Sequence, residues 1–373
     1  MATRLLDDVQ RRDWIRLLKS ENVGPATFRQ LINRFGSASQ ALEALPELSR
    51  KGGLKRPIVL YSEEAASRDL EATQAIGARF VAIGEAEYPE LLRHIDAAPP
   101  LLCLKGDAGL LQLSCIGIVG ARSASAAGRR FARELALALT QAGLCVVSGL
   151  ARGIDTAAHE AALERATVAV LAGGLDVTYP PENAALQASI AERGLLVSEM
   201  TPGTIPKAEH FPRRNRIISG VSLGVIVVEA ELRSGSLITA RLAGEQGRDV
   251  FAVPGSPLDP RAAGPNRLIR DGATLITSAD DVLEALGPAL SGQALLLPDP
   301  FMAPPSSYHD DASVPDDLRN RILALLGPAP VSIDDLIREA QAPTAAIMTV
   351  LLELELAGRL SRQNRQRISL LPP

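Results

Sequence analysis

From about residue 75 to residue 286, short apolar runs alternate with stretches in which apolar side chains recur every three or four positions. Runs of four or five apolar residues are typical of strands buried on both faces, and the longer period is typical of amphipathic helices. The strand candidates are residues 80–83, 116–119, 144–148, 168–171, 195–198, 225–228, 250–253 and 274–276. The alternation predicts a doubly wound α/β fold, with a Rossmann-like, mostly parallel sheet covered by helices on both faces.

The amino-terminal part of the chain carries a purely helical pattern. Residues 8 to 65 contain two apolar stripes, the second of which runs from Phe28 to Phe35. A tight turn, Asn22 to Pro25, separates the stripes and places proline where it can open the next helix. This outline is similar to a helix-hairpin-helix or SAM-like module, whose turn can touch a DNA backbone. Because the turn lacks lysine and arginine, a helical packing domain without a ligand is the alternative.

The carboxy-terminal part begins after a stretch rich in Pro, Ser and Ala that has no periodicity and is typical of a linker. Three short helices (318–326, 333–339 and 345–356) and two strands (358–362 and 367–370) follow, which outline a winged helix. The predicted domains are a helical domain at 1–68, a Rossmann-like domain at 69–288, a linker at 289–314 and a winged helix at 315–373.

The third helix of this predicted winged helix has an unfavourable charge for DNA. A winged helix normally meets the major groove of duplex DNA with that helix. Here it carries Glu353 and Glu355, and no basic residue lies between Pro343 and Gly358. Because carboxylates repel phosphates, we expect this domain to meet protein or to tune a dimer. An auxiliary contact between the hairpin arginines and a duplex backbone is the alternative.

The overall charge argues against a uniformly basic surface. The net charge is −4, so any nucleic-acid binding must come from a local patch. Only five of the 39 basic residues are lysines. A GC-rich genome explains this bias, so the excess of arginine does not by itself indicate nucleic-acid binding. The three cysteines show no metal or redox spacing and are expected to be buried thiols in a reducing cytosol. The amino terminus lacks a signal-peptide core and no apolar run reaches membrane-spanning length, so we expect a soluble cytoplasmic protein without membrane insertion.

The most informative segment chemically is HFPRRNRIIS, residues 210–219. It offers one aromatic ring for stacking, three guanidinium groups for phosphates and one amide for a base edge or for backbone. These groups belong to Phe211, Arg213, Arg214, Arg216 and Asn215. A stacking ring among phosphate clamps is typical of a site that holds nucleic acid.

Glycine-rich turns at the predicted strand ends add candidate phosphate contacts. Backbone N–H groups exposed by such turns favour an anion, and helix starts reinforce this preference. The candidates are Arg122 in VGARS, Ser148, Gly149, Arg152 and Gly153 in SGLARGID, Gly173 and Gly174 in LAGGLD, and Gly235 and Ser236 in RSGS. Ligands bind beyond the carboxyl ends of the strands in such sheets, where we place all these motifs. Asp155 is expected to cap the helix at 156–163, and Glu229 to position Arg214 or Arg216, with a general base as the alternative for Glu229.

Several activities lack support in the sequence. No P-loop and no G-x-G-x-x-G motif occurs, which disfavours a P-loop NTPase and a classical dinucleotide site. The four histidines show no metal-ligand spacing, and the strand ends lack the paired carboxylates that a Mg²⁺-dependent nuclease needs. No catalytic constellation is apparent, so we expect a protein without enzymatic activity, metal or cofactor.

The ordered motifs resemble the DNA-processing protein A (DprA/Smf) family. They are GxR, SGxARGID, GGLD with YPPEN, FPxRNRII, EAxxxSGSLITA and VPG, and they extend over residues 116 to 286. The resemblance implies binding of single-stranded DNA without strong sequence preference, loading of RecA onto it in natural transformation and recombination, and a homodimer formed through the Rossmann-like domain. The DNA pocket that it implies comprises Arg122, Ser148, Gly149, Arg152, Gly153, Phe211, Arg214, Asn215 and Arg216. Lys207, four residues before Phe211, is a further candidate phosphate contact, and the role of Arg213 is left open.

Two rival functions remain open at this point. A phosphoribohydrolase of the LOG type also carries a glycine-rich strand end with a glutamate, but this chain shares only the short Gly-Ser-x-x-Thr portion. A nucleotide-sensing Rossmann module that does not bind DNA is the other rival.

Overall fold

The computed structural model describes residues 5–290, 314–363 and 367–371, in two compact units. Within the described residues, one unit comprises 69–95 and 101–290, and the other comprises 5–68, 96–100, 314–363 and 367–371. The expected linker at 289–314 falls almost entirely outside the described residues. The helical domain and the winged helix, at opposite ends of the sequence, therefore share one unit.

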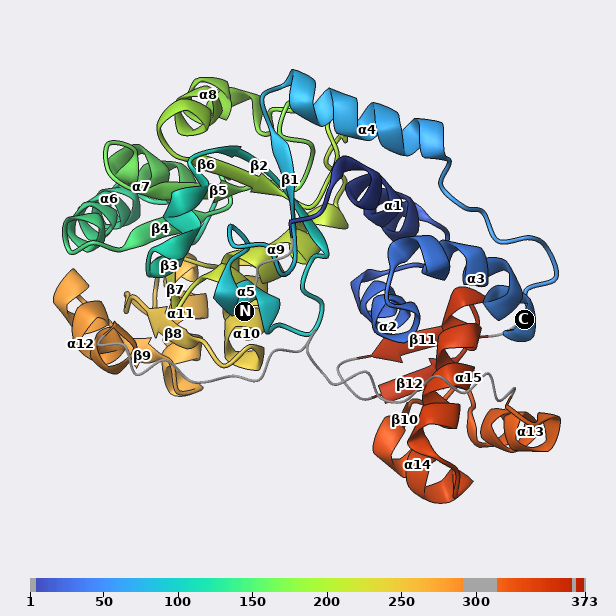
Figure 1. The fold of residues 1–373 in the computed structure, drawn as a ribbon. Coiled ribbons are helices and arrows are strands. Elements are labelled where there is room, and N and C mark those ends of the chain that lie inside the picture. Colours follow the sequence, from blue (N-terminus) through green and yellow to red (C-terminus); the bar gives the residue numbers. More distant parts are fainter. Residues whose placement is uncertain (1–4, 291–313, 364–366, 372–373) are drawn as a thin grey trace. The chain divides into compact units, whose positions relative to one another are not determined.

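The first unit is built on a nine-stranded sheet with the order β1-β2-β6-β5-β4-β3-β7-β8-β9 (Figure 1). Its strands are β1 (Arg79–Ala82), β2 (Leu101–Gly106), β3 (Cys115–Val119), β4 (Cys145–Ser148), β5 (Thr167–Val170), β6 (Leu195–Ser198), β7 (Gly224–Val227), β8 (Asp249–Ala252) and β9 (Thr274–Leu275). All neighbours from β6 to β9 are parallel, whereas β2 is antiparallel to both β1 and β6. The predicted Rossmann-like, mostly parallel α/β fold is confirmed. Strand β2 was not predicted.

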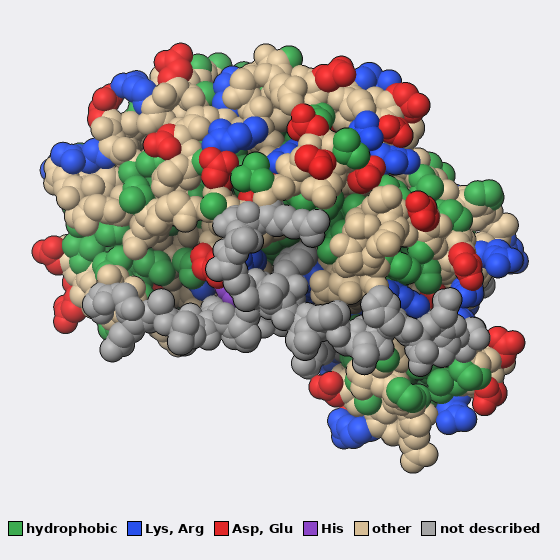
Figure 2. Space-filling model, in the orientation of Figure 1, with side chains coloured by type: hydrophobic (Ala, Val, Ile, Leu, Met, Phe, Trp, Pro, Cys, Tyr) green, Lys and Arg blue, Asp and Glu red, His purple; other side chains and the backbone are tan. Residues whose placement is uncertain are grey.

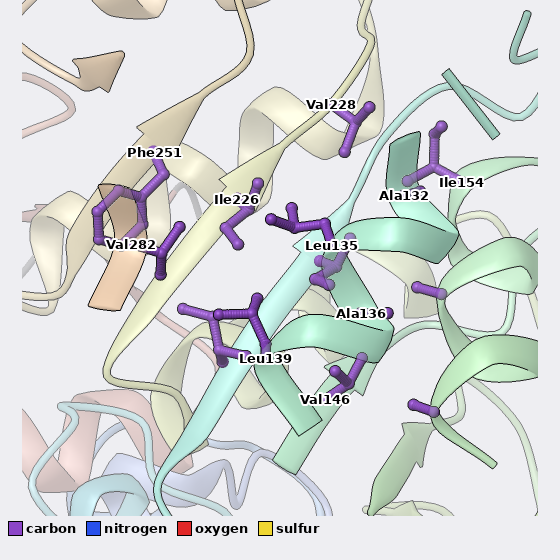
Figure 3. Packing of buried hydrophobic residues seen from close by; sticks show 14 of the residues in the cluster. Ala132, Leu135, Ala136, Leu139, Val146, Ile154, Ile226, Val228, Phe251 and Val282 are labelled. Carbon is purple, nitrogen blue, oxygen red and sulfur yellow. The ribbon is translucent and has the colours of Figure 1, made fainter. Parts of the chain in front are cut away.

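Helices cover both faces of this sheet. Between residues 63 and 290 the helices are α4 (Glu63–Ala75), whose first residues belong to the second unit, α5 (Glu90–Arg93), α6 (Ala126–Gln141), α7 (Ile154–Ala162), α8 (Ala184–Arg193), α9 (His210–Val221), α10 (Gly235–Glu245), α11 (Ala263–Arg270) and α12 (Ala279–Leu290), with 3₁₀ turns at η1 (Ala108–Gln112), η2 (Pro181–Asn183) and η3 (Pro260–Ala262). On one face, α6 contributes Leu135 and Leu139 to a core that includes Ile226 and Phe251 (Figure 3). On the other face, Gly117 of β3 lies under the end of α9, because a Cβ there would approach the Ser222 hydroxyl to 3.4 Å.

The strand order reverses at β3. From β3 the chain proceeds to β4, β5 and β6 on one side, and later returns to β7, β8 and β9 on the other. The loops that follow the carboxyl ends of β3 and β7 therefore run in opposite directions, and a crevice forms between them. Ligands bind at this position in open α/β sheets.

The segment HFPRRNRIIS departs from the expected placement at a strand end. It forms helix α9, which begins at His210, well after the end of β6 at Ser198. A helix places successive side chains about 100° apart, so neighbouring arginines in this motif cannot all face one ligand. Arg214, Asn215 and Arg216 are in fact all buried.

The second unit combines the helical domain with the winged helix. Helices α1 (Asp8–Lys19), α2 (Pro25–Phe35) and α3 (Ala38–Lys51) form the helical domain. The winged helix comprises α13 (Asp316–Leu325), β10 (Val331–Ser332), α14 (Ile333–Ala340), α15 (Thr344–Leu356), β11 (Leu360–Gln363) and β12 (Arg367–Leu370). Strand β12 lies between β10 and β11 in an antiparallel sheet. In the part of the chain that the structure describes, every helix is too short or too polar to span a bilayer.

Candidate functional site

A pocket of about 350 Å³ lies at the carboxyl ends of β3, β4 and β7, where the strand order reverses. The loop after β3, the start of α9, the first turns of α10 and the 3₁₀ turn η3 form its walls. The lining residues are Val119, Gly120, Ala121, Arg122, Ser123, Ala151, Asp155, Phe211, Pro212, Arg214, Asn215, Ile218, Glu231, Arg233, Ser234, Gly235, Ser236, Ile238, Thr239 and Arg261. Four arginines face two carboxylates in this lining, so the pocket favours an anion.

An exposed cation and an aromatic ring lie together in this pocket. The Arg122 guanidinium carbon is 5.4 Å from the centre of the Phe211 ring, within the range of a cation–π contact. Phe211 is half-buried, and the Tyr179 ring lies 5.4 Å from it at a tilt of 56°. These contacts fix the ring without covering it completely. The pair offers one surface for stacking and one charge for a phosphate.

Arg214 forms the buried wall of the pocket. It is only 5% exposed, and its Nη1 donates a hydrogen bond to the Val170 carbonyl over 2.8 Å. Burial lowers the pKa of Arg214 to about 10, against the opposing effect of Asp155. Its Nε has no hydrogen-bond partner among the described residues. Gly149 is required beside it, because a Cβ at Gly149 would lie 1.9 Å from Arg214 Nη1.

Asp155 organises the loop after β4. Its Oδ2 accepts hydrogen bonds from the backbone N–H groups of Gly149 at 3.1 Å and Ala151 at 3.3 Å. Burial raises the pKa of this carboxyl group, although Arg214 and the two N–H groups lower it. The expectation that Asp155 caps a helix is wrong in detail, since it lies inside α7 and the cap residue is Gly153. Asp155 instead ties the preceding loop to the helix.

Arg213 and Arg216 turn away from the pocket lining and share one carboxylate. Glu199, after β6, pairs with Arg216 at 2.5 Å and with Arg213 at 3.0 Å. The side chains of Arg216 and Glu199 are 11% and 6% exposed, whereas that of Arg213 is 49% exposed. Burial lowers the pKa of Arg216, and Glu199 opposes this effect. The ion pair between Arg216 and Glu199 therefore anchors α9 to the end of β6.

Glu229 does not pair with Arg214 or Arg216, contrary to expectation. Its Oε1 accepts a hydrogen bond from the Ser125 hydroxyl at 2.5 Å, and its Oε2 accepts one from the Ser125 N–H at 2.9 Å. Ser125 is the N-cap of α6. Glu229 consequently links the end of β7 to the start of α6, and its carboxylate stabilises the positive end of that helix.

The first turn of α10 presents polar groups to the pocket. Ser234 is the N-cap, and its hydroxyl accepts a hydrogen bond from the Ser236 N–H. Asn215 Nδ2 donates to the Gly235 carbonyl at 3.2 Å, which ties α9 to this turn. A Cβ at Gly235 would meet nothing within 4 Å, so the space in front of this turn is open. The arrangement suits a phosphate at the start of a helix.

The remaining candidates lie outside the pocket lining. The Ser148 hydroxyl is fully buried and donates to the Ile118 carbonyl at 2.6 Å. Gly153 has a φ of +81° and packs against the backbone of the loop after β3. Gly173 and Gly174 pack against the loop at 201–206. Arg152 is exposed and pairs with Glu182 at 2.5 Å, and Lys207 is exposed.

The pocket thus brings together six of the predicted site residues and six further charged or polar residues that were not among the candidates. The predicted members are Arg122, Phe211, Arg214, Asn215, Gly235 and Ser236. Among the other members, Arg233 lies two residues after the strand end EAE, and Arg261 lies six residues after the VPG motif and pairs with Asp259 at 2.9 Å. The others are Ser123, Glu231, Ser234 and Thr239. In the described ranges, no cluster of His, Cys, Asp or Glu has the composition of a metal site.

These features define a multidomain α/β protein. Its pocket favours an anion and lies where the strand order of a Rossmann-like sheet reverses. Three family models match the chain in order: the DprA-like N-terminal HHH domain at residues 8–72, DNA recombination-mediator protein A at 79–287, and the DprA winged helix domain at 303–364. The chain belongs to the DNA recombination-mediator protein A family, which confirms the resemblance drawn from its motifs.

Relatives from distant bacteria share much of the chain. Protein Smf of Escherichia coli is 43% identical over 278 residues, which cover 73% of this chain and 72% of the relative. Protein Smf of Synechocystis is 34% identical over 95% of this chain and 97% of its own. The X-ray structure of DNA processing protein A from Streptococcus pneumoniae superposes with a TM-score of 0.57 at 45% identity, covering 60% of this chain and 78% of that one. The structure of DNA processing protein A from Helicobacter pylori, which describes a single-stranded DNA binding mode, superposes with a TM-score of 0.53 at 29% identity, covering 57% of this chain and 96% of that one.

Proposed function

We propose that this protein binds single-stranded DNA in the pocket at the switch point, without strong sequence preference, and loads RecA onto that DNA in DNA uptake, natural transformation and recombination. The relatives support the class of ligand, since the Streptococcus pneumoniae relative is a DNA processing protein and the Helicobacter pylori structure describes a single-stranded DNA binding mode.

The observation that carries the proposal is the cation–π pair of Arg122 and Phe211 beside the open first turn of α10. A base can stack on the half-exposed ring for roughly 1–3 kcal/mol whatever its identity. Its phosphates meet Arg122 and the backbone N–H of Gly235 at the start of α10. Bases of a duplex are already stacked, so this combination favours single strands.

A local site is also what the charge distribution requires. Figure 2 shows acidic and basic side chains interspersed over the visible surface, which agrees with the net charge of −4. Affinity for DNA then comes from a few arginines, and each phosphate neutralised on a single strand contributes about 0.7 to the salt dependence of log K.

The direct test compares a labelled 20-nucleotide oligonucleotide with its duplex by fluorescence anisotropy at two salt concentrations. We expect at least tenfold tighter binding to the single strand, together with a salt slope of two to three contacts. Equal affinity for both forms would refute the proposal.

The hydrogen bonds of Glu229 argue against the rival function of a phosphoribohydrolase. The carboxylate that could have served as a general base is held by both polar groups of Ser125. We therefore expect no free base after incubation with nucleoside monophosphates, measured by chromatography. Release of base that Glu231→Gln abolishes would establish the enzymatic reading, because Glu231 is the other glutamate at this strand end and lines the pocket.

Loading of RecA and formation of a homodimer through the Rossmann-like domain are the finer parts of the proposal. A loader should shorten the lag of the RecA ATPase on oligonucleotide covered with a single-strand-binding protein. Sedimentation at several protein concentrations should show twice the monomer mass. An unchanged lag would remove the loading step, while a pure monomer would remove the dimer.

A further inference from the structure

The third helix of the winged helix, α15, is buried on more than one side. Ile347, Val350 and Leu351 face the core of the winged helix itself. Leu352 and Leu356 instead join the core of the helical domain, in the same buried cluster as Phe28. A helix that is apolar all around must be buried all around. The sequence TAAIMTVLLELEL of α15 has this character.

The polar contacts of α15 are also directed to protein. Glu353 is 2% exposed and forms an ion pair at 2.5 Å with Arg319 of α13, whose Nη1 also donates to the Lys51 carbonyl at the end of α3. Arg34 of α2 donates to the Thr349 hydroxyl at 3.1 Å. Glu353, one of the two glutamates expected to repel DNA, is thus enclosed between the two domains.

The hairpin turn of the helical domain takes part in the same contact through one side of Asn22, which otherwise stays exposed. Asn22 Nδ2 donates to the Leu356 carbonyl at the end of α15 over 3.0 Å. Gly358 lies against the same amide, since a Cβ there would be 3.2 Å from Asn22 Nδ2. One side of the turn that a helix-hairpin-helix module offers to a DNA backbone therefore lies against the winged helix.

We propose that the winged helix is a protein-docking module whose partner is the helical domain of the same chain, and that α15 does not bind duplex DNA. The helix with which a winged helix typically contacts duplex DNA is used here to complete the core of the helical domain. The lack of basic residues in α15 fits this role, because a docking helix needs apolar area and a DNA-reading helix needs positive charge.

A glycine at the contact provides a sharp test. Gly52, at the end of α3, has a φ of −71°, which any residue can adopt, but a Cβ there would lie 1.8 Å from the Glu353 carbonyl oxygen. Gly52→Val should force the two domains apart in the full-length protein. Gly327→Val in the winged helix is the matched control, because a Cβ at Gly327 meets nothing within 4 Å.

Hydrogen exchange and duplex affinity are the two measurements. We expect Gly52→Val to raise exchange at least tenfold both in α15 and at residues 20–31, with no change in the control. Affinity for a 20-base-pair duplex should stay within twofold of wild type, and single-strand affinity should be retained. Unchanged exchange in α15 would overturn the docking contact, and a fivefold gain in duplex affinity would show that a DNA-binding surface had been released.

A second, milder variant tests the same contact in case Gly52→Val does not fold. Asn22 has a φ of +60°, so Asn22→Gly keeps the backbone conformation and removes only the hydrogen bond to Leu356. Exchange should rise about threefold at both ends of the chain together. A rise at residues 20–31 alone would contradict mutual burial.

Discussion

Phe211 and Arg122 divide the chemistry of the pocket between stacking and charge. We expect Phe211→Ala to weaken binding of a single-stranded oligonucleotide about 5- to 100-fold with a nearly constant salt slope, because stacking is insensitive to salt. Arg122→Ala should instead lower the slope by about 0.7. Arg122 is the better probe of charge than Arg214, whose removal would leave buried Asp155 unpaired. Anisotropy titrations at four salt concentrations measure both effects, and equal losses of slope would mean that Phe211 only shapes the pocket.

A substitution at Gly149 can displace the Arg214 side chain while leaving the arginine in the sequence. Gly149→Ala places a methyl group where Arg214 Nη1 now lies, so the guanidinium must move and lose its bond to the Val170 carbonyl. We expect single-strand affinity to fall at least fivefold. Gly244→Ala in α10 is the control, since its Cβ would meet nothing within 4 Å. Wild-type affinity for Gly149→Ala would exclude Arg214 from the site.

His159 makes stability depend on pH. It is fully buried, and burial lowers its pKa from 6.5 to about 3. The unfolded chain therefore takes up a proton at a pH where the folded protein does not, so this residue reduces stability as pH falls from about 6.5 towards 3, by up to about 1.4 kcal/mol per pH unit. His159→Gln should lose this part of the slope in urea unfolding between pH 7 and pH 5. Identical slopes for the two proteins would contradict the prediction.

At the scale of elements, α9 depends on one carboxylate. Glu199→Ala leaves Arg216 buried and without its ion-pair partner, and should lower the free energy of unfolding by about 3–5 kcal/mol. Glu182→Ala breaks the exposed pair with Arg152 and should cost less than about 1 kcal/mol. Chemical denaturation measures both. Similar costs for the two variants would show that Glu199 does not anchor the helix.

The strands were largely predictable because each is a short apolar run, and the order of the motifs located the switch point. Strand β2 also has such a run, Leu101 to Leu104, but it pairs antiparallel and interrupts the strand–helix alternation on which the prediction relied. Within α9 the sequence identified the right residues but not their directions. Whether an arginine faces the pocket or Glu199 depends on a partner outside the motif. For the same reason Arg233 and Arg261 were missed.

At the scale of the whole molecule, the winged helix should matter more for stability than for DNA. A chain shortened at Leu290 loses the contacts of Leu352 and Leu356 with the helical domain. We expect it to keep single-strand affinity within threefold, because no residue lining the pocket is removed. Its helical domain should become sensitive to protease around residues 20–58. A tenfold loss of affinity would place the winged helix in the DNA site, and protease resistance equal to wild type would contradict the shared core.

The hydrogen bond between Asn22 and Leu356 joins residues that are 334 positions apart in the sequence. A ribosome adds about 5–20 residues per second, so roughly 15–70 s separate the synthesis of its two partners. Throughout that interval the helical domain lacks Leu352 and Leu356, which complete its apolar core. The helical domain is therefore synthesised well before the residues that finish its packing.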